Sequence, residues 1–233
     1  MGSTSKGVTQ GLQRVRVWDW PTRLFHWSLA LSVVGSVVSA KVGGNAMEWH
    51  FRFGLAVLAL LVFRLIWGVV GGRWSRFASF VYAPGTLWRY LRGQSRPDEL
   101  LDVGHSPAGA LAVFGLLGLL AVQVLTGLVA DDEIASTGPL IRFVESATAL
   151  AATSWHKTWG QWLLLGLVAL HLVAITVYRL VHRRDLVTPM LVGDKALPPS
   201  VPASADHAGQ WVLALIALSL GVAAALWVQA LGG

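Results

Sequence analysis

Five long apolar runs decide what this chain can fold into. They occupy residues 22–40, 50–70, 107–130, 155–180 and 210–230. A helix rises 1.5 Å per residue, so each run is long enough to cross a hydrocarbon layer of about 30 Å. Of all 233 residues, 55% are apolar and only 13% are charged, which is too little charge to cover a soluble domain. We therefore predict an all-α fold: an integral membrane helical bundle in contact with lipid.

Composition limits the chemistry further. The sequence contains no cysteine, which excludes disulfides, iron–sulfur clusters, covalently attached c-type haem and thiol catalysis by this chain. The formal net charge is +6. In a membrane protein an excess of basic residues reports orientation, so we expect no nucleic-acid partner. The N-terminus has no short apolar core before a small-residue cleavage site, and we expect no cleaved signal peptide.

Basic residues gather on alternate connections between the apolar runs. Three segments are basic, at residues 6–23, 73–96 and 179–195, whereas the two remaining connections are mainly acidic. Basic connections stay on the cytoplasmic side of a membrane. The pattern therefore predicts a cytoplasmic N-terminus and a C-terminus on the outer side.

Four histidines fall into two pairs at matching depths. With this orientation His26 lies near the inner end of the first run, while His50 and His156 open the second and fourth runs at the outer face. His171 follows His156 in the same run. On a helix this spacing is a rise of about 22 Å and a net rotation of about 60°, so both side chains face the bundle. The pairs are His26 with His171 and His50 with His156.

Two bis-histidine haems, stacked across the membrane, would satisfy this arrangement. Each iron would take one imidazole nitrogen from each of two opposing helices. Arg23, Arg52 and Lys157 lie near the expected depths, where they could pair with propionates. Small residues that would let a macrocycle approach a helix backbone are Gly35, Gly54, Gly160 and Gly166. Another transition-metal site, a proton relay or structural hydrogen bonding remain open. A zinc site is disfavoured because no carboxylate accompanies His171.

Other polar side chains near the helix ends have simpler interpretations. His105, His182 and His207 are expected to be polar anchors at the membrane interface. His105 also competes with His26 as the inner ligand. We favour His26, which lies within an apolar stretch, because a proline two residues after His105 is typical of a helix start. Arg64 is expected to extend to the membrane surface.

Several motifs along the chain are typical of one family. They are "VWDWPTRLFHW", "WHFRFGLAVLALLVFRLIWGVVGGRWSRFASFV", "GHSPAGAL", "LTGLVADDEIASTGPL" and "DLVTPMLVGDK". Together they resemble bacterial cytochrome b subunits of the cytochrome b561 and nickel–iron hydrogenase type, over about residues 15–195. The resemblance implies a helical bundle with two non-covalently bound haem b groups, ligated from the first, second and fourth helices. The matching ligands here are His26, His50, His156 and His171.

The resemblance also divides the chain. It implies a cytoplasmic N-terminal segment and a four-helix di-haem domain, followed here by a linker and an additional membrane helix. The corresponding residues are 1–21, 22–195, 196–209 and 210–233. The fifth helix departs from the family pattern and has no histidine in its apolar run, so we expect it to have no haem role.

Two haems stacked across a bilayer would conduct electrons. The resemblance implies an electron-transfer subunit of an oxidoreductase in a bacterial inner membrane. It would connect the quinone pool with a periplasmic redox protein, either a hydrogenase subunit or a c-type cytochrome, and quinone would be a further ligand. The acidic Asp131, Asp132 and Glu133 would suit a basic partner or form a solvated loop. Two alternatives are a superoxide:ubiquinone oxidoreductase that acts alone and a membrane anchor without a cofactor. The acidic outer loop weakens the first, which needs a cationic funnel.

Overall fold

Five long spans form the body of the molecule, as the apolar runs predict. The computed structural model describes residues 11–96, 99–134 and 136–232, so Lys6 of the first basic segment lies outside them. The long helices are α1 (Trp20–Val42), α2 (Met47–Val70), α4 (Pro107–Leu128), α5 (Ser146–Trp155) with α6 (Gln161–Leu180), and α8 (Ala208–Ala230). Each of the five spans is long and apolar enough to cross a membrane. The chain is an all-α membrane bundle.

The fourth span is longer than the apolar pattern predicts. It begins at Ser146 rather than near residue 155, and a turn of π-helix, His156–Gly160, joins α5 to α6. A π turn adds a residue to the helix and is frequent at functional sites. Its first residue here is one of the four paired histidines.

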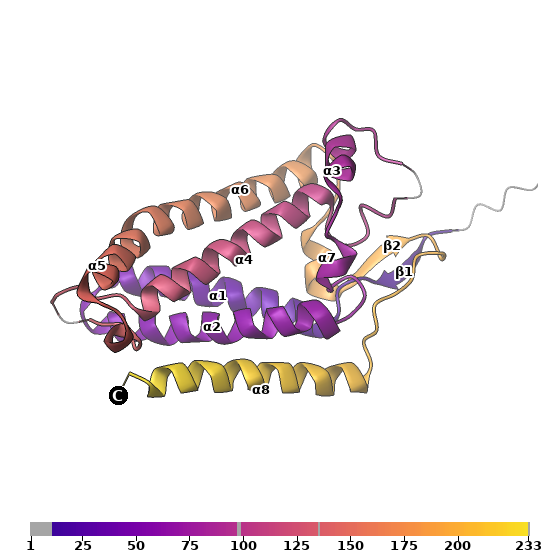
Figure 1. Cartoon of the computed structure of the whole chain (residues 1–233). Coiled ribbons are helices and arrows are strands. Elements are labelled where there is room, and N and C mark those ends of the chain that lie inside the picture. The colour runs from indigo at the N-terminus through magenta and orange to yellow at the C-terminus, as the bar shows by residue number, and fades with distance from the viewer. Residues whose placement is uncertain (1–10, 97–98, 135, 233) are drawn as a thin grey trace, which may run out of the picture.

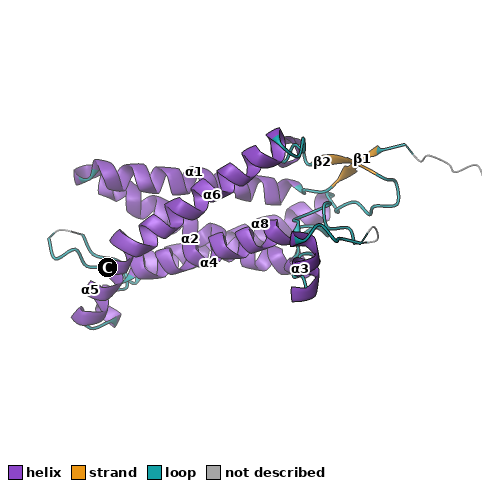
Figure 2. Ribbon diagram, turned by 90° about the horizontal axis from the view of Figure 1, so that it is seen from above, coloured by secondary structure: helices purple, strands orange, loops and turns teal. Residues whose placement is uncertain are grey.

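Helix α2 lies at the centre of the arrangement. Helix α1 lies beside it, α4 and α6 lie on one side, and α8 runs along the opposite side (Figure 1; Figure 2). The most extensive helix contacts are those of α2 with α1 and with α8. Small residues let α8 approach α2 closely, because a Cβ at Gly221 of α8 would collide with the carbonyl oxygen of Ala59 on α2.

Short elements gather at one end of the bundle. Strands β1 (Gln13–Arg16) and β2 (Asp194–Leu197) pair antiparallel, and α3 (Pro84–Leu91) and α7 (Val187–Val192) lie at the same end (Figure 1). We call this the ribbon end, and the opposite one the α5 end. The sequence did not predict the strands, because each has four residues and pairs with a segment from the other end of the chain.

A small apolar core stabilises the ribbon end. Its buried members are Val15, Val17, Trp18, Trp74, Val103 and Val201. Val201 belongs to residues 196–209, which we expected as a linker. Two hydrogen bonds from Ser204 hold this segment in place. The Ser204 hydroxyl donates to the carbonyl oxygen of Val17 over 2.8 Å, and the backbone N–H of Ser204 donates to the carbonyl oxygen of Arg16 over 2.7 Å.

A buried carboxylate joins the start of α1 to the end of α2. Asp19 is fully buried and caps α1 by accepting from the N–H of Thr22 over 2.8 Å. It also accepts from the N–H of Gly72 over 3.0 Å, from the hydroxyl of Ser75 over 2.9 Å and from the indole N–H of Trp67 over 3.3 Å. These donors stabilise the ionised carboxylate and fix the depth at which α1 enters the bundle.

Candidate functional site

His50 and His156 meet at the α5 end of the bundle. Their ring centroids lie 5.9 Å apart, with His50 on α2 and His156 on the π turn before α6. The sequence pairs these residues by depth alone, and the structure brings their rings together.

Backbone carbonyls hold one nitrogen of each ring. Nδ1 of His50 lies 2.9 Å from the carbonyl oxygen of Ser36, and Nδ1 of His156 lies 2.9 Å from the carbonyl oxygen of Gln123. A carbonyl oxygen can only accept, so these partners assign the proton to Nδ1 in both rings. In the neutral ring Nε2 is then the nitrogen with the lone pair, and within the described residues neither Nε2 makes a hydrogen bond. Histidines that bind a metal commonly donate their other ring N–H to a carbonyl oxygen in this way, which fixes the orientation of the ring.

The spacing of the two rings also fits a shared metal. A metal–imidazole bond is about 2.0 Å long, so two rings on one metal have centroids roughly 6 Å apart. The observed separation is 5.9 Å. The donor set is two neutral nitrogens with no carboxylate, and no group of three or more His, Asp or Glu side chains in the described residues could enclose an ion. Both facts favour a metal whose remaining ligands come from a macrocycle.

His26 lies near the start of α1 and His171 in the second half of α6, so both are on the half of the bundle nearer the ribbon end. Nδ1 of His26 is buried and has no hydrogen-bond partner. The pairing of His26 with His171 stays a prediction, and within the described residues no backbone carbonyl accepts a hydrogen bond from either ring.

An apolar layer separates the two pairs. Its buried members, contributed by α2, α4 and α6, are Val57, Leu61, Leu120 and Leu164. Leu164 lies between His156 and His171 on the fourth span, and Leu29 of α1 packs against the same cluster. The layer keeps water and polar groups out of the space between the two depths.

Two residues that sequence reasoning missed support His156. The side-chain amide of Gln123 donates to the carbonyl oxygen of His156 over 3.2 Å, and a Cβ at Gly127 would lie 3.0 Å from Cε1 of the His156 ring. Gly160, which the sequence did suggest, leaves room for the Gln123 side chain. An amide in the middle of the apolar run 107–130 is the sequence signal that could have identified Gln123.

The three basic residues proposed for propionates occupy different surroundings. Arg23 is buried at the ribbon end, where its Nη1 donates to the carbonyl oxygen of Leu191 and its Nε has no partner. Arg52 pairs with Glu48 and lines a groove between α2 and α8, so the structure does not bring it to the histidines. Lys157 follows His156 directly and is exposed.

Arg64 and His105 differ from the expectations for them. Arg64 is only 3% exposed, so the prediction that it extends to the membrane surface was wrong. His105 packs between Trp18 and Phe80, with ring centroids 4.7 and 4.5 Å away, so it is no polar anchor. Burial and the nearby Arg64 guanidinium lower the pKa of His105 to about 3. His182 and His207 are exposed, in keeping with the expectation.

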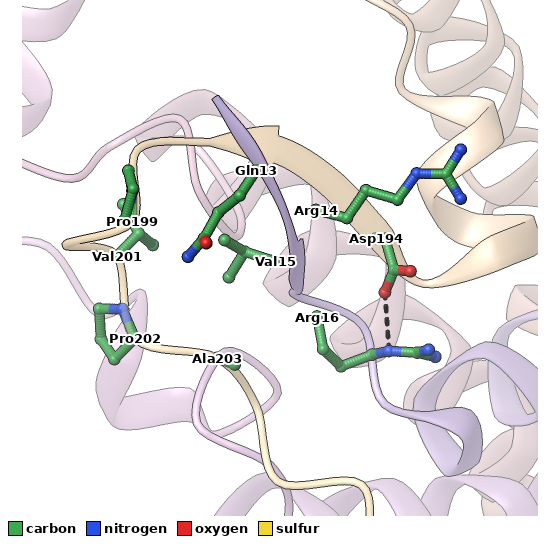
Figure 3. A pocket seen from close by; sticks show the side chains of 9 residues that line it. All are labelled: Gln13, Arg14, Val15, Arg16, Asp194, Pro199, Val201, Pro202 and Ala203. Carbon is green, nitrogen blue, oxygen red and sulfur yellow. Dashed lines mark ion pairs between the residues drawn. The ribbon is translucent and has the colours of Figure 1, made fainter. Parts of the chain in front are cut away.

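One hollow of the surface has a lining that includes none of the four paired histidines. It has a volume of about 600 Å³ and lies between β1 and residues 199–203 (Figure 3). Arg16 in its wall is already paired with Asp194 over 2.8 Å and with Asp206 over 3.2 Å. We assign no chemistry to this hollow.

Comparison with known proteins places the chain among membrane cytochromes. The sequence model of the family described as prokaryotic cytochrome b561 matches residues 17–193. The probable Ni/Fe-hydrogenase 1 B-type cytochrome subunit of Escherichia coli (strain K12) is 26% identical, over 66% of this chain and 79% of the relative. The probable Ni/Fe-hydrogenase B-type cytochrome subunit of Bradyrhizobium diazoefficiens is 23% identical, over 79% and 87%. That of Cupriavidus necator is 25% identical, over 82% and 92%. No solved structure matches the chain significantly.

Proposed function

Because the chain belongs to the prokaryotic cytochrome b561 family, and is thus a b-type cytochrome that transfers electrons in a bacterial membrane, we propose that it holds two haem b groups, one above the other. His50 and His156 would hold the haem at the α5 end. His26 and His171 would hold the haem at the ribbon end. Haem b, when bound, supplies a one-electron redox centre at each depth.

A single observation carries this proposal. Both rings of the α5-end pair donate Nδ1–H to backbone carbonyls, which leaves two Nε2 lone pairs on rings 5.9 Å apart. A pair of structural histidines would use its second nitrogen in a hydrogen bond. The carbonyl partners fix ring orientation and increase the basicity of the ligand nitrogens, so these side chains are prepared to bind a metal.

The remaining residues set the environment of the two sites. The apolar layer around Leu164 and Val57 excludes water between them and lowers the local dielectric, which is one means by which a protein tunes a redox potential. His105 stays a rival of His26, since the charges of both His26 and His171 act on it. We prefer His26 because Trp18 and Phe80 cover the His105 ring.

We further propose that electrons pass between the quinone pool and a periplasmic hydrogenase. The names of the relatives support this partner. The positive-inside pattern supports a cytoplasmic ribbon end and a periplasmic α5 end. A c-type cytochrome is the other candidate partner. The acidic turn at residues 131–133 gives little support to docking, because Oδ1 of Asp131 accepts from the N–H of Glu133 and Oδ1 of Asp132 accepts from the N–H of Ile134.

Two further assignments follow. Residues 22–195 form the cofactor-binding unit, and α8 is an addition that covers α2. The structure does not favour a superoxide:ubiquinone oxidoreductase. Such an enzyme needs a cationic funnel for its anionic substrate, and Arg52, one of the residues expected to form the funnel, is paired with Glu48.

Sealed vesicles test the proposal. The full-length protein is reconstituted with ferricyanide trapped inside and an impermeant reductant outside. We expect the trapped acceptor to be reduced, and expect His156→Leu and His171→Leu each to abolish transfer, because an electron must use both depths. His182→Leu, which changes an exposed histidine two residues after the end of the same span, is the matched control. Undiminished transfer in both ligand variants, or purified protein without b-type absorption bands, would overturn the proposal.

A further inference from the structure

Arg64 is a buried cation without a counter-ion. Its side chain lies near the ribbon end of α2 and is 3% exposed. Its Nη1 is buried without a hydrogen-bond partner, and within the described residues Arg64 makes no ion pair and no hydrogen bond. Its guanidinium carbon lies 4.5 Å from the ring centroid of Phe77 and 6.0 Å from those of Phe25 and Phe80. Contact with aromatic faces offsets only part of the cost of burying this charge.

The carboxylate of Asp19, which acts on the charge of Arg64, is already engaged. Asp19 acts on Arg64 electrostatically, but its two oxygens accept from the N–H groups of Thr22 and Gly72, the hydroxyl of Ser75 and the indole of Trp67. A carboxylate has about four acceptor positions. Asp19 therefore cannot also supply a paired contact for the guanidinium.

The other polar groups around Arg64 are donors or neutral rings. His105 packs against Phe80, with ring centroids 4.5 Å apart, and the guanidinium of Arg64 lies 6.0 Å from the same Phe80 ring. Nδ1 of His105 is buried without a partner. Nε of Arg23 is a further unpartnered donor at the same end. Phe25, one of the rings around Arg64, directly precedes His26 on α1, so the guanidinium lies on the ribbon-end half of the bundle with His26. Asp206, whose Oδ2 is paired with Arg16, makes no ion pair with Arg64. A planar guanidinium in such a place is suited to a carboxylate or a phosphate.

We propose that Arg64 binds a propionate carboxylate of the haem held by His26 and His171. The inference rests on the proposed function, which puts that haem at the depth of Arg64. The charge has two consequences. It retains the haem through an ion pair shielded from water, and it favours the electron-rich reduced state, so it raises the midpoint potential of the ribbon-end haem.

Redox titration of the purified full-length protein tests the second consequence. The variant Arg64→Met is expected to lower the midpoint potential of the ribbon-end haem and leave that of the α5-end haem unchanged. Arg64→Lys, which keeps the charge, should lower it less. Arg73→Gln removes an exposed arginine at the same end and should shift neither haem. Equal potentials in Arg64→Met and the wild type would overturn the proposal, and the unchanged α5-end spectrum reports that the variant is folded.

Haem transfer to apomyoglobin tests the first consequence. We expect Arg64→Met to release its ribbon-end haem about tenfold faster, as for the loss of one charge-assisted contact. Protein reconstituted with haem dimethyl ester, which has no carboxylates, should show no difference between variant and wild type. A difference that persists with the ester and depends on anionic lipid would assign Arg64 to a lipid phosphate and overturn the proposal.

Two controls cover the remaining cases. If Arg64→Met does not fold, Arg64→Lys replaces it. The rate of haem release from Arg64→Lys is then compared with that from the wild type, first with haem and then with haem dimethyl ester, and the same criteria apply. The proposed function fails separately, if His26→Leu and His171→Leu both retain two haems. In that case the ribbon-end pair binds no haem, whatever Arg64 contacts.

Discussion

The two histidines of each pair are expected at the same depth in the bundle, but the protein holds the two pairs differently. At the α5 end, His50 and His156 each donate to a backbone carbonyl at 2.9 Å, and a π turn and Gly127 make room for the second ring. At the ribbon end, Nδ1 of His26 has no partner. Nη1 of Arg64 and Nδ1 of His105 are also buried without a partner, and the guanidinium of Arg64 lies 6.0 Å from the ring of Phe25, the residue before His26.

Under the proposed assignment of the haems, this difference corresponds to two ways of building a haem site. At the α5 end the chain orients its ligands by its own hydrogen bonds, so the site is organised before the cofactor arrives. At the ribbon end, Asp19 and the small apolar core hold the surrounding backbone in place. The buried polar side chains there lack hydrogen-bond partners, and in this assignment the ligand supplies those partners. We expect the first site to respond mainly to changes in packing, and the second mainly to changes in charge.

The largest expected effect separates the two pairs. His156→Leu should remove the α5-end haem and His171→Leu the ribbon-end haem, so each variant should contain about half the haem of the wild type, because a haem with one axial protein ligand is held weakly. The pyridine haemochrome assay per mole of protein measures this. His207→Leu, an exposed histidine, should keep the full content. Complete loss from either single change would indicate collapse of the bundle and remove the distinction between the sites.

The second effect loosens the frame of the ribbon end. Asp19→Ala leaves several buried donors unpaired and is expected to reduce the free energy of unfolding by about 3 kcal/mol. The ribbon-end haem should then be lost at a lower temperature than the α5-end haem, as followed by absorbance during heating. Glu145→Ala removes a carboxylate that makes no capping hydrogen bond and should change little. Simultaneous release of both haems would show that the two ends unfold as one unit.

A third, smaller effect acts at the α5 end alone. Gly127→Ala places a methyl group about 3 Å from the His156 ring. The substitution should displace the ring and reduce the free energy of unfolding by about 1 kcal/mol. The α5-end haem is expected to change its absorption band and potential, and the ribbon-end haem to keep both. Gly118→Ala, on the same helix with open space at the Cβ position, is the matched control. A spectrum identical to that of the wild type would mean that the ring is free to move.

The smallest effect is a pH dependence of the ribbon end. Burial lowers the pKa of Lys195 from its usual 10.5 to about 8, while its ammonium group donates to the carbonyl oxygen of Val103 over 2.7 Å. Between these two values the unfolded chain binds more protons than the folded one, so stability should rise with pH, by at most about 1.4 kcal/mol per unit. Thermal unfolding of wild type and Lys195→Met between pH 7.5 and 10 measures the difference in slope. Parallel curves for the two proteins would contradict this account.

Much of the membrane part could be predicted from the sequence. Apolar runs and helical spacing are local properties, so the five spans and the depths of His26, His50, His156 and His171 follow from the order of residues alone. The same helical geometry could have placed Arg52 away from His50, because two residues along a helix are a rotation of about 200°. Propensity and hydropathy could not identify the four-residue strands or the buried Asp19.

The sequence by itself determined how many times this chain crosses the membrane and at which heights its imidazoles lie. Only the tertiary structure decided which groups find partners. The carbonyl oxygens of Ser36 and Gln123 reach His50 and His156, while Arg64 is buried with no partner. The physical reason is that hydropathy acts on each segment separately, whereas a hydrogen bond or an ion pair depends on the relative position of groups far apart in the chain.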